Sequence, residues 1–131
     1  MRSLLHSLRP VRYQSSVSCE SHTLPGVSYT VRRISLGRRI ELAQAIRELA
    51  QELEFRQSGA SAAEQVQAAV LSARIDHVYL RWGLEDVSGL VIDGGPTTAD
   101  TLFASGPEAL LGEVVRRIKA ECGLTDDERK N

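Results

Sequence analysis

The residue types that most often carry chemistry are sparse in this chain and do not form a site. His6, His22 and His77 are far apart, so they do not make a set of metal ligands. His77 directly follows Asp76 on an expected helix, where adjacent side chains diverge, and we expect it to be a surface or half-buried residue. No phosphate-binding loop and no serine nucleophile elbow is present, and residues 93–96 are too few to cradle a phosphate. The sequence therefore predicts no enzyme, no catalytic residue, no metal and no cofactor.

The cysteines and the isolated aspartates also favour structural roles. Cys19 and Cys122 lie near opposite ends without metal-type spacing, and we interpret them as reduced thiols. Cys122 is at helical spacing from Ile118, which favours packing in a core over nucleophilic chemistry. The aspartates at positions 86, 93 and 100 stand beside expected turns and helix starts, where aspartate commonly shapes the backbone.

Two arginine pairs are the main candidates for a functional surface. Residues 1–40 hold seven arginines and one acid, a net +6, whereas residues 41–131 hold nine basic and sixteen acidic groups, a net −7. Arg32 and Arg33 fall on an expected strand and point to opposite faces. Arg38 and Arg39 fall at an expected helix start, where they oppose the helix dipole, and such a placement can indicate a partner. A solvated edge, a protein partner and a nucleic acid all remain open.

The element that must position these groups is the longest periodic segment, a helix over residues 37–57. Its apolar stripe is formed by Leu42, Ile46, Leu49 and Leu53, and Ser35 is expected to cap it. A small-residue break follows, and then a second helix over residues 63–82. The apolar face of that helix includes Val66, Val70 and Leu80, and Gly83 is expected to end it as a left-handed cap. The two helices are expected to pack as an antiparallel hairpin.

Shorter elements complete the predicted fold, which is α+β and mainly helical. Residues 27–34 alternate as a strand with Val27, Tyr29 and Val31 on one face. Residues 87–99 indicate a small β-hairpin turning at 93–95, and Thr98 is expected to cap a short helical turn over 99–105. A third main helix begins near residues 105–108, buries a stripe from Leu111 to Cys122 and stops at Gly123.

Composition and length set the domain boundaries. The chain has 131 residues, 42% hydrophobic and 25% charged, which suits one soluble domain, and no apolar run approaches a membrane span. Residues 1–24 are rich in serine and arginine, and are interpreted as a flexible basic extension, an over-long start or a transit peptide. Residues 25–123 are the predicted single domain, and residues 124–131 a charged tail.

Three segments carry a family resemblance. "LPGVSYTVRRISLGRRIEL", "IDHVYLRWGLEDVSGLVIDG" and "AECGLTDDERKN" resemble small proteins encoded in the tail modules of long-tailed phages and prophages, closest to the tail assembly chaperone family. The resemblance covers roughly residues 24–131. It implies a mainly helical, non-enzymatic protein of the bacterial cytoplasm that binds the tape-measure protein during tail assembly. It also raises the question of a longer form made by ribosomal slippage near Lys130.

The resemblance and the residues together give a function hypothesis with named rivals. We expect a tail assembly chaperone, and the alternatives are a structural tail or head–tail joining protein and a nucleic-acid-binding regulator. The expected partner is the tape-measure or another tail protein; self-association is open, a membrane is not expected and nucleic acid is disfavoured. The candidate partner-binding residues are Arg32, Arg33, Arg38, Arg39, Phe55, Val66 and Val70.

Overall fold

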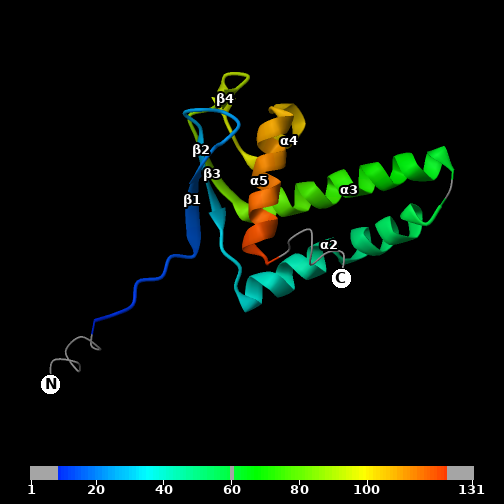
Figure 1. Ribbon diagram of the computed structural model, residues 1–131, viewed down its shortest axis with the longest axis horizontal. Coiled ribbons are helices and arrows are strands. Elements are labelled where there is room, and N and C mark those ends of the chain that lie inside the picture. Colours follow the sequence, from blue (N-terminus) through cyan, green and yellow to red (C-terminus); the bar gives the residue numbers. More distant parts are fainter. Residues whose placement is uncertain (1–8, 60, 124–131) are drawn as a thin grey trace.

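The computed structural model describes residues 9–59 and 61–123, which form a small antiparallel sheet, a long helical hairpin and two further helices (Figure 1). In chain order the elements are β1 (Ser16–Glu20), β2 (Ser28–Arg32), α2 (Leu36–Gln57), α3 (Ala62–Gly83), β3 (Leu84–Ser88), β4 (Val91–Ile92), β5 (Gly95–Pro96), α4 (Ala99–Ser105) and α5 (Glu108–Glu121). The predicted α+β class, dominated by helices, is confirmed.

β2 is the central strand of a three-stranded sheet in the order β1–β2–β3, and both pairings are antiparallel. Its alternation buries Tyr29 and Val31 on one face, as the sequence pattern predicts. On the other face, the hydroxyls of Ser18 and Thr30 lie 3.3 Å apart across the β1–β2 pair. A register shift between Thr30 and Val31 bends the pairing with β3.

β1 lies within the segment that the sequence prediction assigns to a flexible extension. Val17 pairs with Val31 and Cys19 with Tyr29, so Ser16–Glu20 belongs to the folded unit and the predicted boundary at residue 25 is wrong for this part. The strand is short and rich in serine, and its stability comes from pairing with β2 rather than from its own pattern. Residues 1–8 and the predicted tail 124–131 lie outside the described residues.

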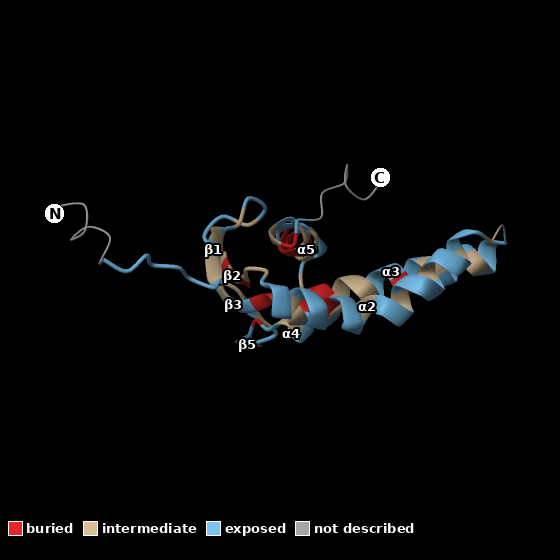
Figure 2. Cartoon of the chain, turned by 90° about the horizontal axis from the view of Figure 1, so that it is seen from below, coloured by how far each residue is buried: buried red, intermediate tan, exposed pale blue. Residues whose placement is uncertain are grey.

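α2 and α3 form the predicted antiparallel hairpin, which extends well beyond the sheet and α5 (Figures 1 and 2). The Ser35 hydroxyl accepts a hydrogen bond from the Arg38 backbone N–H at 3.2 Å, so the predicted cap of α2 is confirmed. Ser61 caps α3 in the same way through the backbone N–H of Glu64, at 3.1 Å. We call the end beside the sheet the root of the hairpin, and the end around residues 54–66 its tip.

The junction of α3 with β3 differs from the prediction. Gly83 is not a left-handed cap: it is the last residue of α3, and Leu84 continues directly in an extended conformation. A Cβ at Gly83 would lie 2.6 Å from Cγ2 of Ile118. Glycine is required here because α3 and α5 approach closely, not because the backbone turns.

The short elements after β3 follow their local sequence signals. Asp93 and Gly94 have φ angles of 50° and 78°, which form the tight turn between β4 and β5. Thr98 and Thr101 cap α4 reciprocally, each side chain bonding the other residue's backbone N–H. Gly123, with a φ of 77°, follows the end of α5 as predicted.

The core lies between the inner face of the sheet, α5 and the root of the hairpin. Its most deeply buried side chains are Val31, Leu80, Leu102, Leu110, Val114 and Ile118. Cys122 is buried beside them, as predicted, and burial raises the pKa of its thiol.

The outer half of the hairpin contributes little to this core. Within the predicted α2 stripe only Leu42 is buried, and Leu49 stays half-buried. Beyond the root the stripe faces α3 alone, because the outer half of the hairpin stands clear of the other described elements (Figure 1). A two-helix layer covers each helix on one side only, so both keep exposed outer faces.

Candidate interaction surfaces

The outer face of α3 carries a strip of small apolar residues, which we call the α3 outer strip: Ala62, Val66, Ala69, Val70 and Ala73. Their spacing places them on one side of the helix. All are exposed, including 61% of Val66 and 41% of Val70. Two residues that the sequence analysis names as partner-binding are therefore available to a partner.

The side of α3 that packs on α2 is a different one. Leu71 is buried and Ile75 half-buried on this side, roughly opposite Val66 and Val70. Val66 and Val70, which the sequence places on the same apolar face as Leu80, therefore do not lie on the side that packs on α2. The α3 outer strip holds no charged residue. Glu64 is the charged residue within residues 62–73, and its carboxylate accepts a hydrogen bond from the Ser61 hydroxyl instead of lying on the strip.

Phe55 lies near the tip of the hairpin, with 69% of its surface exposed. The guanidinium of Arg56 lies 5.8 Å from the centre of its ring, a cation–π contact on an exposed surface. Phe55 is on α2, whereas the α3 outer strip is on the other helix, so the structure does not join these predicted residues into one patch.

Arg32 is the last residue of β2, and Arg33 directly follows the strand. Nε of Arg32 lies 3.3 Å from Oε1 of Glu85 on β3. The guanidinium of Arg33 lies 5.8 Å from the centre of the Tyr13 ring. Each arginine thus contacts its own chain.

Arg38 and Arg39 at the start of α2 also bind backbone carbonyls of this chain. Nη1 of Arg38 donates to the carbonyls of Ser15 and Arg33, both at 3.3 Å. Nη1 of Arg39 donates to the carbonyl of Cys122 at 3.3 Å, which ties α2 to the end of α5. The predicted basic candidates are therefore divided among local structural contacts, and they do not form a common patch.

Sequence reasoning missed Glu113, whose pKa is strongly lowered. This α5 residue is buried, and its carboxylate accepts hydrogen bonds from Tyr29 Oη at 2.8 Å, Thr23 Oγ1 at 2.9 Å and Ser21 Oγ at 3.0 Å. Backbone N–H groups of His22 and Thr23 donate to it at 3.1 Å. The arrangement fastens the β1–β2 loop to α5.

Burial by itself raises the pKa of Glu113, but the hydrogen bonds from Tyr29, Thr23 and Ser21 outweigh it and lower the pKa to about 2. The pKa of Tyr29 rises, first through burial and then through its hydrogen bond to Glu113. The carboxylate is enclosed by donors of its own chain, so its role is structural. The apolar pattern of α5 does not predict that Glu113 is buried. An acidic residue between Leu110 and Val114 looks in the sequence like a surface residue.

His77 joins α3 to α4. Its ring stacks on Phe103 with centroids 4.0 Å apart, and Nε2 lies 2.9 Å from Oδ1 of Asp100. Nε of Arg81 lies 3.5 Å from the same oxygen. In the described part of the chain, no serine or cysteine side chain is hydrogen-bonded to His77. The half-buried position expected from the sequence is where the structure places it.

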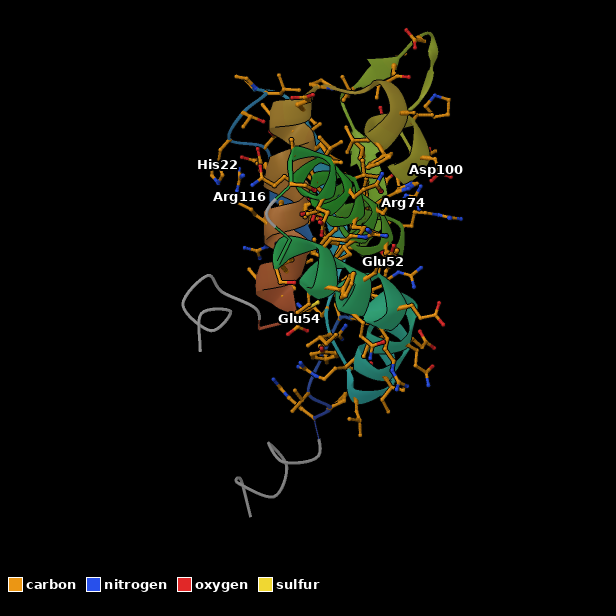
Figure 3. All side chains as sticks on the ribbon, turned by 90° about the vertical axis from the view of Figure 1, so that its right-hand side faces the viewer. His22, Glu52, Glu54, Arg74, Asp100 and Arg116 are labelled. Atoms are coloured by element: carbon orange, nitrogen blue, oxygen red, sulfur yellow. The ribbon has the colours of Figure 1, made fainter. Side chains whose placement is uncertain are left out.

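Figure 3 looks along the hairpin from its tip and shows side chains crowding every side of it, with Asp100 and Arg74 on the same side of the molecule.

Over residues 9–59 and 61–123, no group of three or more His, Cys, Asp or Glu residues could hold a metal ion. No helix within these ranges combines the length and apolarity that a bilayer crossing needs.

Comparison with protein-family models, with curated proteins and with solved structures finds no significant match for this chain.

Proposed function

We propose that this protein is a non-enzymatic binding protein that holds a helical segment of another protein against the α3 outer strip. Together with the family resemblance, this makes it a tail assembly chaperone whose client is the tape-measure protein. The observation that carries the proposal is an uncharged apolar strip, exposed over about three turns in the outer half of α3, which stands clear of the core.

The strip suits a helical client for steric reasons. Ala62, Ala69 and Ala73 let another helix approach closely, while Val66 and Val70 supply apolar surface at its centre. An amphipathic helix with its own apolar stripe would complete the packing. Covering the two valines contributes about 1–2 kcal/mol each. Such a gain supports reversible association, which an assembly factor needs because it must release its client.

The test is co-purification with the tape-measure protein encoded in the same tail module. We expect the wild-type chain to raise the solubility of that protein and to elute with it. Replacing both Val66→Lys and Val70→Lys should abolish the association, because burying two ammonium groups against apolar surface is unfavourable. Ser72→Lys is the matched control: it adds a charge to an exposed position outside the strip and should leave binding intact.

A nucleic-acid-binding regulator is the second candidate, favoured by one observation on the sheet. A groove of about 490 Å³ lies over β1 and β2 and is lined by Arg12 and Arg33 with polar neighbours. Retarded migration of DNA at ~0.15 M salt, combined with no tape-measure association, would establish this function instead.

Association that survives the double valine substitution would show that the α3 outer strip is not the binding surface.

A further inference from the structure

A side of α2 next to the stripe that packs on α3 carries a second, different pattern. Its exposed residues recur at alternating spacings of four and three, which is the 3.5-residue period of a coiled coil. We call this set the α2 seam: Leu36, Ile40, Ala43, Arg47, Ala50 and Glu54. Leu36 is 76% exposed and Ile40 is 51% exposed, although both are large aliphatic side chains.

The seam coincides with an open groove of about 550 Å³. Four seam residues, at positions 40, 43, 47 and 50, line it, and Gln44, Ile46 and Gln51 flank them. These flanking residues occupy the positions that border the apolar seam in a coiled coil. All of these lining residues belong to α2, so the groove is a shallow, open strip on one face of this helix.

We propose that the α2 seam binds the same seam of a second copy of this chain in antiparallel orientation, giving a homodimer. In this register Ile40 lies opposite Ala50 of the second copy, and Ala43 lies opposite the second copy's Arg47. Leu36 lies opposite the second copy's Glu54. The seam is about 27 Å long at 1.5 Å per residue, and a two-fold axis crosses its centre.

Side-chain size is complementary in this register. Ile40 meets an alanine, and Arg47 lays its aliphatic stem over Ala43 while its guanidinium reaches solvent. Large residues thus face small ones in these layers, which lets the two helices approach closely.

Charge decides the orientation. A parallel pair would place Arg47 against Arg47 and Glu54 against Glu54, so that two layers would hold like charges. The antiparallel pair moves the two Glu54 side chains to opposite ends of the seam, offsets the two Arg47 side chains by about one turn, and brings Glu54 of the second copy within about one turn of Arg39. Figure 3 shows Glu54 and Glu52 on opposite sides of α2, so that Glu54 is the acid placed at the seam.

The dimer is independent of the proposed client site. The α3 outer strip is on the other helix and faces away from α2, so both strips stay open in the dimer. One of the two surfaces can therefore fail its test while the other passes.

The full chain tests the dimer by sedimentation equilibrium at concentrations on the order of 100 µM. We expect a mass of twice 14.4 kDa. Ile40→Lys should weaken dimerisation at least about tenfold and return the chain to a monomer, with an unchanged circular dichroism spectrum because Ile40 is exposed. Val66→Lys is the matched control and should leave the dimer unchanged. A wild-type monomer at every concentration, or a dimer weakened by Val66→Lys and not by Ile40→Lys, would overturn the proposal.

Cross-linking tests the orientation. Ile40→Cys and Ala50→Cys are introduced into separate chains that carry Cys19→Ser, with the buried Cys122 left in place. Under mild oxidation the mixed pair should form a disulfide several-fold faster than either chain with itself, because antiparallel pairing places these positions opposite one another. Preferential self-linking of the Ile40→Cys chain would show a parallel pair and would refute the antiparallel register.

Discussion

Glu113 gives the sharpest stability prediction, because its carboxylate collects five hydrogen-bond donors from one loop and one strand. Its pKa in the folded protein is about 2, against an unfolded value of about 4.3. Because the folded pKa lies below the unfolded one, folding favours the ionised form. The stabilisation is complete above pH ~5 and is lost as the pH falls through the unfolded and then the folded pKa.

The magnitude follows from the difference in pKa. A shift of about two units corresponds to about 3 kcal/mol at neutral pH. At pH 3 about half of this remains, because part of the unfolded state's proton uptake has already occurred. For a domain of this size, 3 kcal/mol is a large fraction of the total free energy of unfolding.

Urea unfolding of Glu113→Gln and wild type, followed by circular dichroism between pH 7 and pH 2, measures the effect. We expect the variant to be less stable by about 3 kcal/mol at pH 7, with the gap shrinking below pH 4. Asp86→Asn, at an exposed strand position, is the matched control and should show no such convergence. A gap that stays constant across pH would mean that Glu113 acts through packing rather than charge, and the reasoning above would be refuted.

Two further stability predictions follow from the packing. Gly83→Ala should destabilise the protein by about 1–3 kcal/mol because the new Cβ meets Ile118, and in thermal unfolding its cost should be smaller in an Ile118→Ala background, which lacks the side-chain atoms that the new Cβ meets. No destabilisation by Gly83→Ala would mean that α3 and α5 are not closely packed there. Leu80→Ala should cost about 2–5 kcal/mol because Leu80 is fully buried. Leu49→Ala should cost clearly less, since Leu49 is half-buried; equal losses in chemical denaturation would contradict the burial difference.

The local sequence determined those structural features whose interacting residues lie close together in the chain. Ser35, Thr98 and Gly123 act at helix ends through hydrogen bonds or backbone angles set within a few residues. The periodicity of residues 37–57 and 63–82 likewise determined two helices and their pairing. Such signals are readable because both interacting partners lie in one short segment.

The tertiary structure decided the features that join distant segments. β1 exists because β2 pairs with it, Gly83 is needed because Ile118 approaches it, and Glu113 is buried because a loop some ninety residues earlier donates to it. The two predicted arginine pairs look alike in sequence, yet their groups bind different segments of the fold. These outcomes depend on long-range contacts that no local pattern encodes.

The same distinction applies to the interaction surfaces. The sequence determined that α2 and α3 each carry more apolar positions than one stripe requires, including Ile40 and Val66. Only the tertiary structure decided which of these positions face the partner helix and which stay open. A helix in a two-membered layer buries one side, so Leu71 faces inward while Val66 and Ile40 remain at the surface.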